Sequence, residues 1–470
     1  MKKHSNNEHS IFKRFVRFLK KNRGSYVSVC LVVVLIILIG KAVESSINNG
    51  GFDLKTYLSS IIDLKTFVTI VLVFILTGIA SLIGGLFAPK VEDMMKLTTN
   101  YDMLAKKYGV FSELIKYTNS GTSDYLTGRK NTASKAKNYN NDSKKYDGNE
   151  DKYDFPTIKL VSLYDKKVDI IFDFDSANVY KQPSWVSSHS DALFAAHSHS
   201  EIYNQQNFRV DNITWDKRNV KIYLSKTSYL DSLITNRACD YEINGVSVRE
   251  LYEPGPVLHD LKDSQLSNHL GYNGMVETSD HKFIFIKRHK KVSIAKNTWQ
   301  TSVGASLKVR NALTKDRKVD TDSIANAIVK EMMSEFNLKN LDNSSEIEAK
   351  MKSDFSFKKN VLYFYRDLLE CGKPQMMFYY QLPINSEEVA KAFTNGIGAA
   401  KKNRDRFSLF CDIDGHKLMF IDREYLNKLY LTPDGFAFNK KFYKSVPNAV
   451  ATIVMLLGFF GSKQNTQQSL

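Results

Sequence analysis

Cysteine is scarce in this chain, and the signature motifs of several enzyme classes are missing from it. The 470 residues include four cysteines, Cys30, Cys239, Cys371 and Cys411, and no two of them have CxxC spacing. A zinc site built on thiolates is therefore not expected, and scattered single cysteines fit a reducing compartment. The sequence also has no GxSxG, P-loop or HExxH motif, so serine hydrolases, P-loop NTPases and zinc proteases lack their usual sequence support here.

Two apolar stretches without charged residues stand near the N-terminus, at residues 25–40 and 66–89. A helix needs about 20 apolar residues to cross a bilayer core of roughly 30 Å. The second stretch reaches this length, and Arg23 and Lys41 can extend the first by snorkelling. We therefore predict transmembrane helices at 25–43 and 66–88, joined by an external connector at 44–65. A signal peptide is the alternative for the first stretch, although no small-residue cleavage site follows it.

Charge around these stretches predicts their orientation. Residues 1–24 form a basic flank with eight Lys or Arg side chains and one acidic residue, Glu8. Because positively charged flanks stay inside, the N-terminus and the chain after residue 88 are expected in the cytoplasm. The predicted topology is thus multi-pass, with the N-terminus and the C-terminal domain on the cytoplasmic side of the membrane.

Small residues recur in the second stretch at the spacing that lets helices approach closely in lipid. Ala80 and Gly84 form one such pair, and Ser81 and Gly85 form another. The pairs fit association between copies, giving a homo-oligomer, and they equally fit packing of the second helix on the first.

The net charge of +16 invites the hypothesis of a nucleic-acid partner. The basic flank alone accounts for seven of these charges, and the remainder are spread thinly along the chain. A nucleic-acid polymer is therefore not expected as the partner, whereas a small anionic ligand such as a nucleotide is compatible with the surplus.

Composition divides the rest of the chain into four parts. Residues 89–154 read as a juxtamembrane helix over 90–118 and a polar linker, and residues 155–253 as a β-rich unit with strands at 158–164, 168–174, 219–225 and 240–245. Residues 254–461 contain a predicted hairpin around Ser279, a helix over 322–337 and a closing core helix over 447–461, for which a third membrane span is the alternative. Residues 462–470 are a polar tail. The predicted fold class is a membrane-anchored α+β protein.

The hairpin, the basic loop after it and the helix occur in the order found in the Nudix family, and this region resembles that family. The Nudix box has the form G-x5-E-x7-R-E-U-x-E-E-x-G-U, where U is apolar. Gly304 matches its first glycine, and residues 330–338 match its helical half. The resemblance implies a Nudix-like α/β/α domain in which Glu331 and Glu335, one helical turn apart, bind Mg²⁺ and support hydrolysis.

Several positions depart from the box. Lys330 replaces the arginine, Ser334 replaces a glutamate, and Arg310 stands where the upstream glutamate would be. Asn337 replaces the final glycine, which is compatible with a left-handed helix end. Since negative charge that would hold the metal is lost, Mg²⁺ is a candidate but not a certain cofactor, the catalytic residues are unknown, and binding is favoured over hydrolysis.

If the domain binds a nucleotide, cations must contact its phosphates. The candidates are Arg288, Lys330, Arg366 and Lys373, and Trp299 or Tyr365 would stack on a base. Each of them also fits an ordinary surface or core position.

Taken together, the two-helix anchor, the linker and the degenerate Nudix-like domain resemble the two-transmembrane Nudix-type membrane effectors of bacterial CBASS antiphage defence. The resemblance implies a multi-pass location in the bacterial inner (plasma) membrane. It also implies that a cytosolic domain senses a cyclic nucleotide made by a partner synthase. Binding would then drive oligomerisation of the transmembrane helices in the lipid bilayer, membrane disruption and abortive infection. The alternatives are a membrane-anchored Nudix hydrolase of nucleoside diphosphate derivatives and a non-catalytic membrane scaffold.

Overall fold

A mixed nine-stranded sheet organises the part of the chain that the computed structural model describes, which is residues 96–119, 151–164, 168–197, 200, 204–290, 292–403 and 415–468. Met94–Leu470 form one compact unit. The strand order is β1-β2-β10-β11-β6-β7-β12, with β9 paired to β6 and β8 paired to β7. The strands are β1 (Leu114–Thr118), β2 (Lys152–Ser162), β6 (Gly271–Glu277), β7 (Lys282–Arg288), β8 (Trp299–Gln300), β9 (Val303–Ser306), β10 (Val361–Asp367), β11 (Lys373–Gln381) and β12 (Gly415–Asp422).

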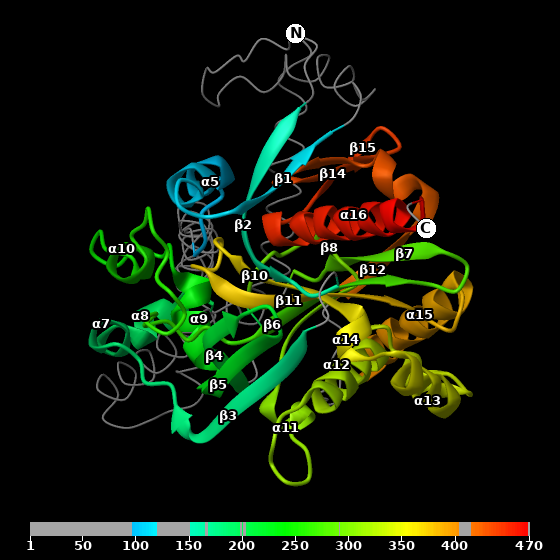
Figure 1. The fold of residues 1–470 in the computed structure, drawn as a ribbon, viewed down its shortest axis with the longest axis horizontal. Coiled ribbons are helices and arrows are strands. Elements are labelled where there is room, and N and C mark those ends of the chain that lie inside the picture. Colours follow the sequence, from blue (N-terminus) through cyan, green and yellow to red (C-terminus); the bar gives the residue numbers. More distant parts are fainter. Residues whose placement is uncertain are drawn as a thin grey trace, which may run out of the picture. The chain divides into compact units, whose positions relative to one another are not determined.

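Helices cover both faces of this sheet (Figure 1). On one face lie α12 (Thr321–Glu335), α13 (Ser344–Asp354), α14 (Phe357–Asn360) and α15 (Ser386–Asn403), and on the other lies α16 (Pro447–Gln468). The apolar side of α12 packs with one face of β6, β10 and β11. Buried α16 residues such as Val450 and Leu456 pack with the opposite face of the same strands.

A second, three-stranded sheet shares the core on the α12 side. Its order is β3-β5-β4, and its strands are β3 (Asp169–Val179), β4 (Gln206–Trp215) and β5 (Asn219–Ser228). Phe208 of β4 and Ile222 of β5 are fully buried in the same cluster as Ile328 of α12. The β-rich unit predicted at 155–253 and the region after it therefore share one hydrophobic core.

Shorter elements complete the described chain. They are α5 (Tyr101–Gly109), α7 (Ser184–Ser188), α8 (Ser190–Ala195), α9 (Tyr229–Ile234), a 3-10 turn η3 (Asn236–Ala238), α10 (Val248–Tyr252), α11 (Val309–Ala312), the 3-10 turns η4 (Leu338–Asn340) and η5 (Arg423–Lys428), and a small sheet of β13 (Tyr430–Thr432), β14 (Gly435–Phe438) and β15 (Lys441–Lys444).

Local sequence signals explain why α12 begins and ends where it does. The Asp320 carboxylate accepts a hydrogen bond from the Ser323 backbone N–H at 2.7 Å and caps the N-terminus. Ile324, Ile328 and Met332 recur at every fourth position and are all fully buried. Asn337 has φ of 57° and ends the helix in the left-handed region. The predicted helix over 322–337 and its left-handed end at Asn337 are both confirmed.

Other local predictions have mixed outcomes. The hairpin is confirmed as β6 and β7, and the closing core helix is confirmed as α16, which continues through most of the predicted polar tail. The helix predicted over 90–118 is wrong in its second half, because residues 114–118 form β1 and pair with β2. The strand predicted at 240–245 is wrong as well, since only Ile243 makes a bridge, with Val246, across a tight turn.

The membrane-anchored architecture and the multi-pass inner-membrane localisation require correction. Among the helices of the described residues, none combines the length and the apolar character needed to cross a membrane. In α16 the apolar run gives way to Ser462 and a polar end before it reaches membrane length. The two segments on which the prediction rested, 25–43 and 66–88, lie outside the described residues, as do Ala80, Ser81, Gly84 and Gly85.

Candidate functional site

The two glutamates of the Nudix-like helix lie on one side of α12 and face the sheet. Burial raises the pKa of Tyr272, on β6, well above its ordinary value, and the negative charges of Glu331 and Glu335 raise it further. Lys308 donates two hydrogen bonds from Nζ to the Glu331 carboxylate, at 3.3 and 3.1 Å. Glu335 is itself buried, with 8% of its surface exposed. The spacing predicted from the sequence therefore does bring both carboxylates to one place.

This donor set does not fit a Mg²⁺ site. Magnesium demands near-octahedral oxygen coordination, and the ammonium group of Lys308 already occupies one of the two carboxylates. At the upstream position Arg310 supplies a cation instead of a carboxylate. Within the described part of the chain, no group of three or more His, Cys, Asp or Glu side chains could hold a metal ion. The residues on α12 and around it thus lack the ligands that metal-dependent hydrolysis needs.

The four cations predicted to contact phosphate do not converge. Lys330 is exposed on α12, where its Nζ lies 3.3 Å from Asn311 Oδ1. Arg288, on β7, donates from Nη1 to Gln300 Oε1 at 3.0 Å. Arg366 is in β10 and Lys373 begins β11, where Lys373 pairs in register with Asp367. Neighbouring strand residues point to opposite faces, so Arg366 and Lys373 lie on different sides of the sheet.

Arg366 is buried in the fold, where two of its nitrogens are hydrogen-bonded and its Nη2 has no partner among the described residues. Its Nε donates to the Gly372 carbonyl at 2.7 Å, and its Nη1 donates to the His259 carbonyl at 2.5 Å. Burial lowers the pKa of its guanidinium to about 10, against the opposing effect of Glu253. The predicted stacking residues are buried too, since Tyr365 is 0% and Trp299 is 9% exposed. Neither aromatic ring is available to stack on a base.

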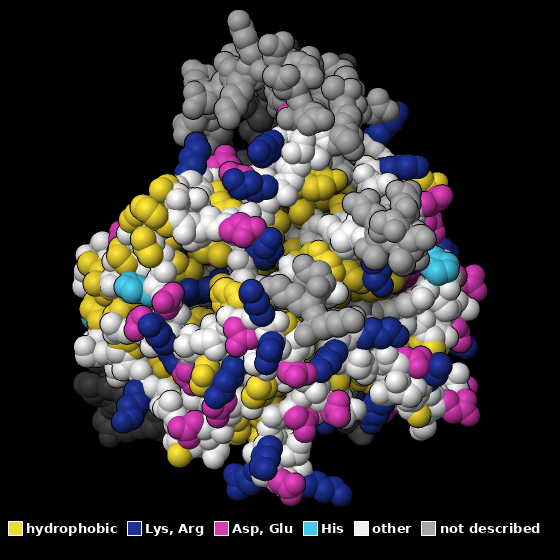
Figure 2. Space-filling model, viewed as in Figure 1, with side chains coloured by type: hydrophobic (Ala, Val, Ile, Leu, Met, Phe, Trp, Pro, Cys, Tyr) yellow, Lys and Arg dark blue, Asp and Glu magenta, His cyan; other side chains and the backbone are white. Residues whose placement is uncertain are grey.

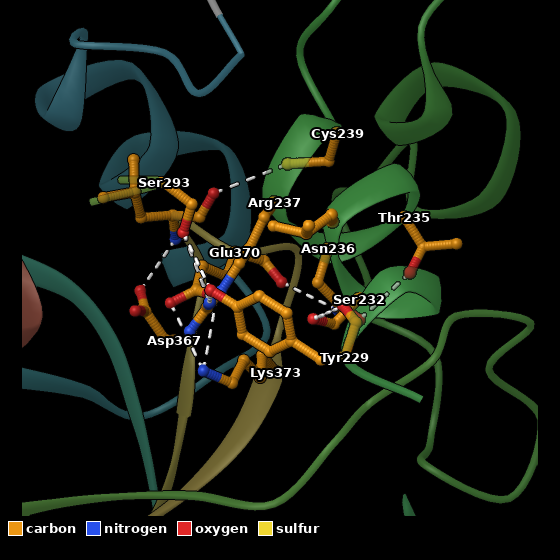
Figure 3. Close-up of polar contacts among 12 residues, drawn as sticks. Tyr229, Ser232, Thr235, Asn236, Arg237, Cys239, Ser293, Asp367, Glu370 and Lys373 are labelled. Carbon is orange, nitrogen blue, oxygen red and sulfur yellow. Dashed lines mark hydrogen bonds and ion pairs between the residues drawn. The ribbon is translucent and has the colours of Figure 1, made fainter. Parts of the chain in front are cut away.

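Lys373, by contrast, belongs to a polar cluster that no sequence pattern indicated. We call Tyr229, Arg237, Ser293, Glu370 and Lys373 the Arg237 cluster (Figure 3). Arg237 Nε donates to Glu370 Oε2 at 3.0 Å, and Lys373 Nζ lies 3.3 Å from the same oxygen. Arg237 Nη1 donates to the Tyr229 hydroxyl at 2.7 Å, and that hydroxyl lies 3.0 Å from Ser293 Oγ. Three segments that are distant in the sequence therefore meet around one carboxylate.

Burial perturbs every ionisable group at the inner end of this cluster. Burial lowers the pKa of Lys373 to about 8, although Glu370 acts in the opposite direction. Burial, together with the charge of Glu370, raises the pKa of Asp367 to about 7. For Glu370, burial alone would raise the pKa, but Lys373 and Arg237 hold it below its ordinary value. The Glu370 carboxylate is thus negatively charged at neutral pH, whereas the neighbouring Asp367, with a pKa of about 7, is about half protonated there.

Two buried histidines lie beside the cluster, and both have lowered pKa values chiefly because they are buried. His269 is fully buried, and neither of its ring nitrogens has a hydrogen-bond partner among the described residues. Burial lowers its pKa well below the ordinary value, and the charges of Lys373 and Arg237 lower it further. Burial and the charge of Lys96 lower the pKa of His197 to about 3. Both imidazoles are therefore neutral and face cations.

Sequence reasoning found Lys373 but missed its partners. Glu370 precedes Lys373 by three residues and is a visible acidic neighbour, but Arg237 lies 133 positions away from Glu370. His269 stands between two strands and carries no motif. No periodicity or spacing connects these positions.

The comparisons with known proteins do not assign a family. A scan against protein-family models finds no model that matches the chain, and a search of curated proteins finds no match either. The relation to Nudix proteins therefore stays a resemblance of pattern and order in the sequence.

Proposed function

We propose that this protein binds a nucleotide ligand of the cyclic nucleotide class and does not cleave it. The observation that carries the proposal is the ion pair between Lys308 and Glu331, at 3.1 Å and with 16% and 12% of the side chains exposed. An ammonium group neutralises the carboxylate that a Nudix-type metal would need. This ion pair thus favours retention of a bound phosphate ester over metal-dependent attack on it.

The ligand class is supported by two further features. In the Arg237 cluster, Arg237 and Lys373 both lie within 3.3 Å of the Glu370 carboxylate, and these side chains are the types that bind phosphate groups in proteins. On the face drawn in Figure 2, Lys and Arg side chains are interspersed with Asp and Glu, so this face offers no continuous basic surface for a nucleic-acid polymer. The resemblance to CBASS effectors favours a cyclic nucleotide supplied by a partner synthase.

Calorimetric titration of the purified full chain tests the proposal directly. The ligands are a panel of cyclic di- and trinucleotides with Mg²⁺ present, and the products are separated by chromatography after incubation. We expect one member of the panel to bind and to be recovered intact. Glu335→Gln serves as the matched variant and should leave the ligand equally intact.

Two outcomes would overturn the proposal. Cleavage that is lost in Glu335→Gln would establish a hydrolase of nucleotides in spite of the Lys308 ion pair. Absence of binding across the whole panel would favour a scaffold in which this fold serves only for docking.

A further inference from the structure

We infer that two copies of this chain pair antiparallel through the outer edges of their β12 strands and form a symmetric dimer with one continuous sheet. The inference goes beyond the proposed function and does not depend on which ligand binds. It also concerns a different part of the chain from residues 80–85, whose small-residue spacing led us to expect a homo-oligomer. No sequence motif indicated β12 as an interaction surface.

The first argument is that β12 closes one end of the nine-stranded sheet. Within the described residues it pairs with β7 and with no other strand. The Arg423 N–H, directly after β12, donates to the His281 carbonyl at 2.9 Å. Residues at odd-numbered positions in the regular part of β12 therefore direct their backbone groups toward β7. Leu418, Phe420 and Asp422 direct their N–H and C=O groups outward, and such a row is a template for a further strand.

The second argument is the apolar character of this edge. Leu418, Met419 and Phe420 are consecutive, and all three are only half-buried. Lys417 precedes them, Asp422 ends the strand, and this stretch contains no proline. Proteins normally protect the edges of their sheets with inward-pointing charges, with proline or with a covering element. The centre of β12 has no charge or proline of its own, so it gains from pairing with another strand.

The edge strand β3 gives a contrast within the same molecule. Among the described strands it pairs only with β5, so it also ends a sheet. Its exposed face carries Asp169, Asp173 and Asp175. Two β3 strands paired antiparallel would bring these carboxylates opposite one another, and like charges across a ladder are destabilising. Self-pairing therefore suits β12 and does not suit β3.

The backbone and the side chains together select one register for the β12 pair. Outward-pointing backbone groups must meet, and opposite side chains must share a face, so even-numbered residues pair with even-numbered ones. Pairing Leu418 with Phe420 meets both conditions and places Met419 opposite Met419 of the second copy. A shift by two residues in one direction places Leu418 opposite Asp422, and a shift in the other direction leaves Asp422 beyond the end of the second strand. In the selected register the basic start of each strand, at Lys417, lies beside the acidic end of the other.

Sedimentation of the purified full chain over a range of concentrations tests the inference. We expect a dimer that dissociates on dilution. Leu418→Pro removes one outward N–H from each copy and leaves the pairing with β7 intact, so it should weaken the dimer by about tenfold or more. The matched control is Ile170→Pro on β3, where the Asp169 N–H donates to the Arg218 carbonyl at 2.7 Å and the half-buried Ile170 therefore points its N–H outward. This control should dimerise as the unmodified chain does.

Met419→Cys tests the register, and it remains informative if Leu418→Pro does not fold. Opposite residues in a non-hydrogen-bonded pair have Cβ atoms about 5 Å apart, close enough for a disulfide. Oxidised glutathione should therefore convert this variant into a covalent dimer, seen on a non-reducing gel. Lys417→Cys is the control, because residue 417 lies opposite residue 421 and should cross-link far less. The unmodified chain, treated in the same way, shows what its own cysteines contribute.

Three results would overturn the inference. The first is an unmodified chain that stays monomeric at every concentration, which would mean that something other than a second copy covers the β12 edge. The second is a folded Leu418→Pro protein that dimerises as tightly as the unmodified chain. The third is equal cross-linking of Met419→Cys and Lys417→Cys.

Discussion

Removing the Glu370 carboxylate is the sharpest test of the charge arrangement. Glu370→Gln keeps the size of the side chain but leaves Lys373 and Arg237 without their shared anion. Both Glu370 and Lys373 have 3% of the side chain exposed, so water cannot replace the lost partner. Arg237 has 12% exposed and retains the Tyr229 hydroxyl as an acceptor. The main cost therefore falls on Lys373.

The size of this cost follows from two independent routes. Removing one partner of a buried ion pair lowers the free energy of unfolding by about 3–5 kcal/mol. The buried lysine can instead release its proton, at about 1.4 kcal/mol for each pH unit between the solution pH and its pKa in the folded protein. Because the pKa of Lys373 in the unmodified protein is about 8, release at pH 7 costs about 1.4 kcal/mol and limits the share of the loss that falls on Lys373. We therefore expect Glu370→Gln to lower the free energy of unfolding by about 1–3 kcal/mol at pH 7.

Urea unfolding of the full chain, followed by circular dichroism, measures this loss. The control is Glu346→Gln on α13, where the side chain is exposed and a change within about 0.5 kcal/mol is expected. Because Lys373 in the folded protein releases its proton at a pKa of about 8, the part of the loss that falls on Lys373 should shrink as the pH rises through 8. A loss below about 1 kcal/mol at pH 7 would refute the reasoning, because it would mean that Glu370 does not hold these cations.

Three further outcomes are expected. Burial raises the pKa of Asp367 from 3.8 to about 7, so its contribution to stability is complete below pH 4 and is lost as the pH rises through 7. Asp367→Asn resembles the protonated form and should therefore lose less stability than the unmodified protein between pH 5 and pH 8, as measured by urea unfolding. Equal losses in the two proteins would contradict this. Gly274→Ala should lower the free energy of unfolding by about 1–3 kcal/mol, because the added Cβ would overlap the Phe378 ring, and an unchanged urea midpoint would speak against that packing. Added Mg²⁺ should raise the melting temperature of Lys308→Gln but not that of the unmodified chain, because Glu331 loses its ammonium partner in the variant. An equal rise in both proteins would exclude the Lys308 ion pair as the reason that Mg²⁺ does not bind.

Part of the candidate site was predictable, because its signals are local. The i, i+4 spacing of Glu331 and Glu335 places them on one side of a helix, and the structure shows both facing Tyr272. The replacement of two box glutamates by Ser334 and Arg310 already indicated a loss of metal ligands. The ion pair of Lys308 with Glu331 was not predictable, because Lys308 approaches through the turn after β9.

What the sequence by itself determined are the elements whose causes lie within a few residues. The capping carboxylate of Asp320, the apolar stripe of α12 and the left-handed Asn337 define a helix from its own residues. The alternation and turn between β6 and β7 define a hairpin in the same way.

What only the tertiary structure decided is which distant residues meet. The parallel pairing of β11 with β6 places Gln375 opposite Gly271, with the Lys373 ammonium close by. The tight turn between β10 and β11 separates Arg366 from Lys373, and long-range packing brings Arg237 to Glu370 across 133 positions. Capping and periodicity depend on neighbours in the chain, whereas strand register and the burial of charge depend on the whole fold. Helix α12 and the β6–β7 hairpin could therefore be predicted from the sequence, whereas the Arg237 cluster could not.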